Sequence, residues 1–152
     1  MNITQANFDD LPEILALPRV AYQSEAKLLK NDAIPPLTQT LEEVQEEFQK
    51  GVFLILKEDG NSRILGSVRG WVTENTLYIG KLMVHPDFQR RGFGTRLLHE
   101  IETYAPAHTR SELFTSTKSM QNLKLYQDAG FLPFREKEAA PGLTFVFLEK
   151  KK

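Results

Sequence analysis

Residues 82–95 constrain the architecture more than any other part of the chain, and they read Leu-Met-Val-His-Pro-Asp-Phe-Gln-Arg-Arg-Gly-Phe-Gly-Thr. The apolar run Leu82–Val84 is typical of the end of a strand, and Pro86 then indicates a loop. Gly92 and Gly94 fall at the start of a segment whose apolar residues recur with helical spacing. The segment therefore predicts a strand, a loop and a helix that opens with glycine.

The start of this helix is a candidate phosphate site. Free backbone N–H groups at a helix N-terminus bind anionic oxygens, and the helix dipole adds to the attraction. Gly92 and Gly94 let the backbone approach a bulky group closely, while Arg90 and Arg91 can add charge-assisted hydrogen bonds. A tight turn with a solvated basic pair is the alternative for the same residues. The segment is not a Walker loop or a dinucleotide fingerprint, because it lacks the Gly-Lys-Ser/Thr ending and the third glycine.

The chain before this segment opens with a strand and helices. Asn2–Phe8 alternates like a short strand, and a helical apolar stripe follows it. We expect this helix to be interrupted near Pro18 and a second helical stretch to cover residues 20–29. Two adjacent prolines then indicate a loop over residues 31–40.

A third helix and a meander of strands come next. Thr40 and Glu43 have the spacing of a capping box, and Gly51 ends the helix that they begin. Turn sequences then separate three strands, which we expect at Val52–Lys57, Ile64–Val72 and Thr76–Val84. Strands joined by short turns pair antiparallel.

The chain after residue 95 alternates helices and strands. The helix that opens at Gly92 ends before Pro106, and Ser119 and Gly130 bound the next helix. Strands are expected at Glu112–Thr115, Phe131–Phe134 and Leu143–Leu148. Helices on both faces are the simplest cover for so many strands. The sequence therefore predicts one α+β domain over residues 1–152, with a mixed, largely antiparallel twisted sheet and helices on both faces.

Composition excludes several classes of function. The 152 residues hold 19 basic and 20 acidic side chains and no cysteine. A net charge of −1 gives no general attraction to nucleic acid or to anionic lipid, so neither partner is expected. Without cysteine there is no disulfide, thiolate nucleophile or zinc ribbon. The chain has no apolar run that could span a bilayer and its first residues do not resemble a signal peptide, so we expect a cytoplasmic protein.

Two stretches resemble the signatures of the GNAT family of acyl-CoA-dependent N-acetyltransferases. Residues 89–94, Gln-Arg-Arg-Gly-Phe-Gly, are similar to the family's Gln/Arg-x-x-Gly-x-Gly/Ala motif, which follows an apolar strand and opens a helix. Residues 122–131 resemble its Asn-x-x-x-x-Tyr-x-x-x-Gly-Phe pattern, with the gap between Asn122 and Tyr126 shorter by one residue. The resemblance is specific from residue 82 to 131, and the order of elements extends it over most of the chain.

The resemblance implies where acetyl-CoA binds. Pantetheine would lie against the backbone of one strand end like an added strand, and the pyrophosphate would lie on the amides of the loop and first helical turn. Asn122 would contact the pantetheine, and no metal is expected. The implied acetyl-CoA-binding residues are Leu82, Met83, Val84, Gln89, Arg90, Arg91, Gly92, Phe93, Gly94, Thr95 and Asn122.

The resemblance also implies catalytic roles. Tyr126 would lie at the thioester sulfur, where a phenol can donate a proton to the departing thiolate as general acid; a half-buried core tyrosine is the alternative. Many relatives carry an acidic residue on the strand before the proline, but Tyr78–Lys81 holds no carboxylate here. Glu25 is the candidate base, with a solvated helix glutamate as its alternative. His85 is a second candidate, and water alone is a third possibility.

These implications give a function with two rivals. The chain is expected to be an N-acetyltransferase that moves an acetyl group from acetyl-CoA to a primary amine of a small molecule or protein, by direct attack. One rival is a non-catalytic sensor or regulatory module that binds acyl-CoA or CoA. Another is a nucleotide-binding protein that uses the same phosphate site. The acceptor is not identified, and a homodimer through the last strands is implied by the resemblance.

Overall fold

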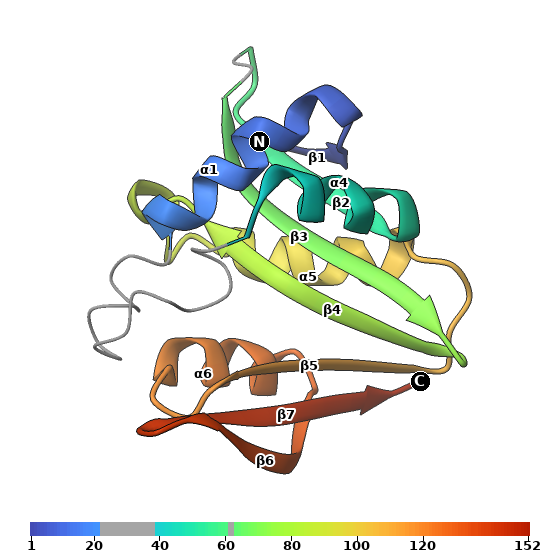
Figure 1. The fold of residues 1–152 in the computed structure, drawn as a ribbon, viewed down its shortest axis with the longest axis vertical. Coiled ribbons are helices and arrows are strands. Elements are labelled where there is room, and N and C mark those ends of the chain that lie inside the picture. Colours follow the sequence, from blue (N-terminus) through green and yellow to red (C-terminus); the bar gives the residue numbers. More distant parts are fainter. Residues whose placement is uncertain (22–38, 61–62) are drawn as a thin grey trace.

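A seven-stranded mixed sheet forms the centre of the molecule in the computed structural model, which describes residues 1–21, 39–60 and 63–152 (Figure 1). The strand order is β1-β2-β3-β4-β5-β7-β6, and every neighbouring pair is antiparallel except β4 and β5. The strands are β1 (Asn2–Gln5), β2 (Val52–Lys57), β3 (Ile64–Thr73), β4 (Thr76–Val84), β5 (Arg110–Ser116), β6 (Leu132–Ala140) and β7 (Leu143–Lys151). The predicted fold class is confirmed.

Helices cover both faces of the sheet (Figure 1). The described helices are α1 (Leu11–Ala21), α4 (Leu41–Lys50), α5 (Phe93–Tyr104) and α6 (Met120–Asp128), with 3-10 turns η1 (Phe8–Asp10) and η2 (Pro86–Phe88). One core lies between the sheet and α1 with α4, and includes Leu11, Ile14 and Val44. A larger core lies on the opposite face and joins α5 and α6 to the sheet through Leu98 and Phe131, among others. These two apolar layers hold the strands in place.

Several element boundaries differ from the prediction. β1 ends at Gln5 because η1 replaces its last residues, and α1 continues through Pro18 instead of being interrupted there. One missing N–H bond is tolerated in a helix whose apolar stripe is anchored in a core. β6 extends to Ala140 because it pairs along nearly the whole of β7. The strand was expected only at Phe131–Phe134, because the residues after it have no apolar pattern that would indicate a longer strand. The expected helix over residues 20–29 and most of the loop over 31–40 lie outside the described residues.

The capping box of α4 is confirmed, and it supports a stability prediction. Thr40 Oγ1 accepts a hydrogen bond from the Glu43 amide at 3.2 Å, and Glu43 Oε1 accepts one from the Thr40 amide at 3.0 Å. Thr40→Ala removes one of these caps and should lower the free energy of unfolding by about 1 kcal/mol. Chemical denaturation monitored by circular dichroism measures this loss. Thr40→Ser keeps the hydroxyl and is the control; equal stability of the two variants would contradict the capping role.

Candidate active site

The sheet opens between its two parallel strands. β4 and β5 pair only through Thr76, Leu77 and Tyr78, opposite Arg110–Glu112, and then diverge (Figure 1). A register shift interrupts the pairing of β4 with β3 at the same level, and Lys81 has a left-handed backbone with φ of 52°. A non-glycine residue in this region costs about 1 kcal/mol or more, which the surrounding sheet must offset. The irregularity turns the end of β4 away from β5.

A cavity of about 720 Å³ lies at the opening. It is the size of a site for a small organic ligand. The end of β4, the loop after it, the start of α5 and the exposed side of α6 form its walls. Residues of the expected acetyl-CoA site on these walls are Leu82, Met83, Val84, Gln89, Arg90, Gly92, Gly94, Thr95 and Asn122. Segments far apart in the sequence thus meet at one cavity, and their role in binding stays a prediction.

Two residues of the expected acetyl-CoA site, Arg91 and Phe93, have side chains that contact other protein groups. The Arg91 guanidinium lies over the Phe88 ring, with 5.3 Å between the carbon and the ring centre, and Arg96 lies over the Phe93 ring at 6.0 Å. Phe93 also packs against the larger core. Arg91 and Phe93 are therefore not among the residues that line the cavity.

The start of α5 has the geometry of an anion site. Gly92 is its N-cap in a left-handed conformation, φ 84°, and its carbonyl accepts the Arg96 amide at 3.1 Å. Gly92 offers no side chain to the free N–H groups of the first turn, so these groups can receive a ligand oxygen. Arg90 and Lys118 add positive charge to the cavity wall. The arrangement suits a phosphate-bearing ligand.

The helix α6 places Asn122 and Tyr126 in different environments. Asn122 lines the cavity and its amide donates a hydrogen bond to Thr115 Oγ1 at 3.3 Å. Tyr126 is 6% exposed and packs in the larger core, with its ring centre 6.4 Å from that of Phe131. Gly130, with φ of 99°, ends the helix and lets the Phe131 amide reach the Tyr126 carbonyl at 3.0 Å. The Gly-Phe pair therefore anchors Tyr126, and its role as an acid stays a prediction.

Of the two candidate bases named from the sequence, His85 is among the described residues. Glu25 lies outside the described residues. His85 caps η2, where its Nδ1 accepts the Asp87 amide at 3.1 Å, and its Nε2 lies 2.9 Å from the Arg63 guanidinium. Both ring nitrogens of His85 are therefore already engaged.

Sequence reasoning missed a charged cluster on the opposite side of β4, beneath α4. Arg69 of β3 is 2% exposed, and its Nη1 contacts Glu47 Oε2 and Gln39 Oε1, each at 2.8 Å. Lys81 Nζ lies 3.3 Å from the other oxygen of Glu47, which also accepts the Gln39 amide at 2.9 Å. The only signal for this cluster in the sequence was the arginine within the largely apolar strand β3. We name Gln39, Glu47, Arg69 and Lys81 the charged cluster.

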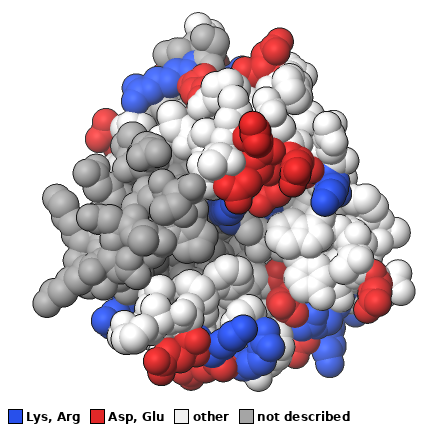
Figure 2. All heavy atoms as spheres, in the orientation of Figure 1, with Lys and Arg blue, Asp and Glu red and all other residues white. Residues whose placement is uncertain are grey.

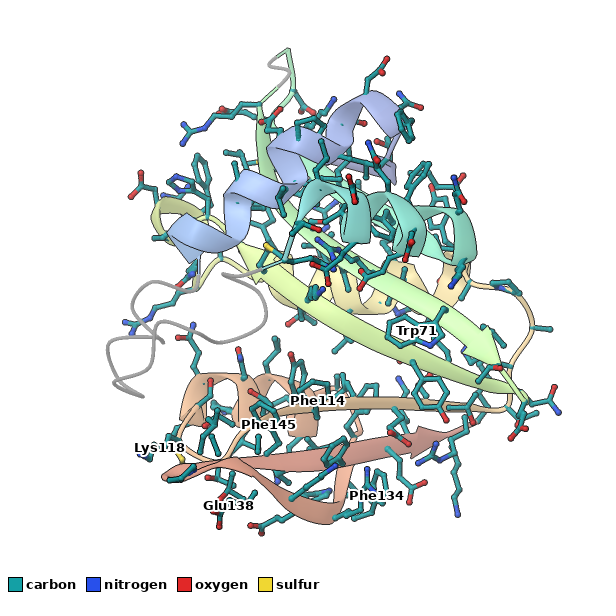
Figure 3. All side chains as sticks on the ribbon, viewed as in Figure 1. Trp71, Phe114, Lys118, Phe134, Glu138 and Phe145 are labelled. Atoms are coloured by element: carbon teal, nitrogen blue, oxygen red, sulfur yellow. The ribbon has the colours of Figure 1, made fainter. Side chains whose placement is uncertain are left out.

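The face that carries the charged cluster also exposes aromatic side chains. Trp71 on β3 is 45% exposed and stacks on Tyr78, with ring centres 5.9 Å apart. Phe114 on β5 is 49% exposed, and its ring centre is 4.9 Å from that of Phe145 on β7. Trp71 and the phenylalanine pair come from opposite sides of the β4–β5 opening (Figure 3). Acidic side chains gather above them over α4 (Figure 2).

The described residues also limit what the site can contain. Within residues 1–21, 39–60 and 63–152, no cluster of three or more His, Cys, Asp or Glu side chains could hold a metal ion. Among the described helices, none combines the length and apolar character that crossing a membrane requires.

An opened parallel strand pair beside a glycine-capped helix N-terminus is an arrangement that suits an extended, anionic ligand. The family model described as "Acetyltransferase (GNAT) family" matches residues 20–131. The chain therefore belongs to the GNAT family of acetyltransferases, whose acetyl donor is acetyl-CoA.

The chain is also similar in sequence to a longer curated protein. A curated relative, UPF0157 protein YqkA of Bacillus subtilis (strain 168), is 29% identical over 131 residues, which cover 86% of this chain and 37% of that protein. The chain thus spans well under half the length of this relative.

Solved structures align along nearly the whole chain. The ribosomal-protein-S18-alanine N-acetyltransferase of Escherichia coli aligns with a TM-score of 0.78 at 17% identity, covering 99% of this chain and 92% of that one. The putative acetyltransferase yncA of Salmonella typhimurium, solved with acetyl-CoA, aligns with a TM-score of 0.74 at 16% identity, covering 99% and 93%. At these identities the likeness establishes the fold.

Proposed function

We propose that the protein transfers the acetyl group of acetyl-CoA to a primary amine of a small molecule or a protein. The observation that carries this proposal is the cavity at the β4–β5 opening, which brings the end of β4, the start of α5 and the side of α6 together. Acetyl-CoA, when bound, supplies a thioester whose carbonyl carbon accepts an amine.

The chain's own residues have distinct tasks in this proposal. The backbone of Leu82–Val84, beyond the last residue of β4 that pairs with β5, would hold an extended pantetheine, and the N–H groups after Gly92 would hold the pyrophosphate. Asn122, whose amide reaches Thr115, would orient the middle of the ligand. Tyr126 would protonate the departing thiolate.

The acceptor would approach from the face of α4. This face carries the charged cluster and the exposed Trp71 and Phe114, and it lies across the sheet from α5. Aromatic rings and nearby carboxylates both attract an ammonium group. We further propose a cytoplasmic location, and a homodimer through the exposed strand β6 at the sheet edge.

Isothermal titration with acetyl-CoA tests the donor site, with ATP and NAD as controls. We expect micromolar binding of acetyl-CoA alone, because the cavity matches a phosphate-bearing, extended ligand. A panel of primary amines, followed by release of the CoA thiol, then tests transfer. Binding without turnover across the panel would favour the non-catalytic sensor. Tight competition by ATP or NAD would favour a nucleotide-binding protein, and no acetyl-CoA binding to folded protein would overturn the proposal.

A further inference from the structure

Lys81 stands at the point where the sheet opens. Its left-handed backbone coincides with the register shift between β3 and β4, just beyond the last residue of β4 that pairs with β5. The next residues, Leu82–Val84, line the cavity expected to hold acetyl-CoA. The Lys81 side chain extends instead to α4, where its Nζ lies 3.3 Å from Glu47 Oε1. Lys81 therefore stands between the donor cavity and the face from which the acceptor would approach.

The charged cluster leaves Lys81 with less compensation than Arg69. Among the described residues, both cations contact the Glu47 carboxylate, and Arg69 makes the shorter contact, 2.8 Å against 3.3 Å for Lys81. The Lys81 side chain is 20% exposed and Glu47 is 41% exposed, so water and an acceptor can reach the pair. Removing a lysine ammonium from water is costly, and an apolar residue at position 81 would avoid that cost.

The ionisation of Lys81 follows from these neighbours. Burial lowers the pKa of the Lys81 ammonium most, and the Arg69 guanidinium lowers it further. Glu47 opposes this by charge and hydrogen bond, and Glu43 on the same helix opposes it weakly by charge. The neutral amine is therefore easier to form than for a solvated lysine. Glu47 is less suited to take a proton, because its oxygens already accept from Arg69, Gln39 and Lys81.

We propose that Lys81, held by Glu47 at the divergence of β4 from β5, is the general base that removes a proton from the acceptor amine. The proposal rests on the transfer reaction proposed above, and it fills the role for which β4 provides no carboxylate. The acceptor arrives as R–NH3⁺ and gives one proton to neutral Lys81, directly or through one water. The neutral amine then forms an N–C bond to the acetyl carbon while the C–S bond breaks. Tyr126 protonates the sulfur and the second proton of the amine restores the Tyr126 hydroxyl, so the products are the acetamide, CoA thiol and protonated Lys81.

Two substitutions separate proton transfer from a simple charge effect. Lys81→Arg keeps the positive charge, but its guanidinium stays protonated at every working pH and so cannot act as a base. Lys81→Met removes both the charge and the amine. If Lys81 is the base, both variants lose about 100-fold in kcat while acetyl-CoA affinity stays within about twofold of wild type. Lys57→Arg, on β2 and outside the cavity wall and the charged cluster, is the matched control and should leave kcat unchanged, because Lys57 also has a carboxylate partner, Asp10. Wild-type kcat in Lys81→Arg would overturn the proposal.

The dependence of kcat/KM on pH distinguishes a base from a residue with only a structural role, because a structural role would not shift this dependence. In the wild type, kcat/KM should rise with pH through the pKa of Lys81, since the neutral amine is the active form. Glu47→Gln removes the charge that raises this pKa, so the rise should move to lower pH. A profile that keeps its position in Glu47→Gln would contradict the assignment. Glu47→Gln keeps one oxygen that can still accept from buried Arg69, which favours folding, while its NH2 group cannot accept from Lys81.

A measurement without acetyl-CoA tests Lys81 by itself. Trace labelling of the protein with acetic anhydride at a series of pH values, read by mass spectrometry, reports the neutral fraction of each lysine. Lys81 should begin to react at lower pH than Lys57, and identical titration of the two would overturn the proposal. Absence of transfer by the wild type would overturn both proposals. Transfer that survives Lys81→Arg would overturn the role of Lys81 alone.

Discussion

Gly94→Arg abolishes the binding of acetyl-CoA, with an expected loss of at least about 100-fold in affinity, while the protein stays folded. Gly94 lies in the first turn of α5, and a Cβ built on it would be 3.4 Å from Leu125 Cδ2 of α6. Both residues line the cavity. A side chain as long as arginine must therefore extend into the space where the ligand is expected. Isothermal titration measures the affinity, and a thermal melt by circular dichroism checks the fold.

The matched control is Gly94→Ala. A Cβ at 3.4 Å is an ordinary van der Waals contact, and Gly94 is not among the described residues with positive φ. Alanine also favours a helix over glycine by up to about 1 kcal/mol, so this variant should fold at least as well. It should bind acetyl-CoA with nearly wild-type affinity. If Gly94→Arg binds as the wild type does, acetyl-CoA lies elsewhere on the protein.

Tyr126→Phe lowers kcat by about 100-fold and leaves the affinity for acetyl-CoA nearly unchanged, if the phenol protonates the departing thiolate. The variant keeps the aromatic ring, so the packing of a 6% exposed side chain against Phe131 is preserved. Single-turnover measurement with excess enzyme isolates the chemical step from product release.

Tyr104→Phe is the control for this substitution. Tyr104 ends α5 and is 42% exposed, so the loss of its hydroxyl should leave turnover unchanged. An unchanged single-turnover rate in Tyr126→Phe would remove Tyr126 from the role of acid. Tyr126 would then be a core residue that holds α6 against the sheet, in keeping with its burial.

Local sequence signals predicted elements whose structure depends on adjacent residues. Thr40 and Glu43 form the expected capping box, and Gly92 takes the left-handed backbone at the start of α5. Glu74 and Asn75 form the expected turn, with φ of 50° and 65°. Each of these features is decided by hydrogen bonds and backbone sterics within a few residues. Such interactions can be evaluated without knowing the rest of the fold.

Other features were missed because they depend on register between distant segments. The length of β6 follows from its pairing with β7, and its exposed, mixed sequence shows no apolar alternation. The burial of Tyr126 depends on how α6 packs on the sheet. The charged cluster joins α4, β3 and β4 with Gln39, which lies two residues before α4, and no motif links those positions.

The sequence by itself determined the order of elements, the loop after β4 with its glycine-opened helix, and membership in the GNAT family, because short-range patterns encode all three. Only the tertiary structure decided that β4 and β5 separate after Tyr78 and that α4 places Glu47 beside Lys81. Strand register and helix packing bring residues 47, 69 and 81 within hydrogen-bond or ion-pair distance across the sheet. Spacing along the chain does not specify that proximity, since it arises when whole elements pack together.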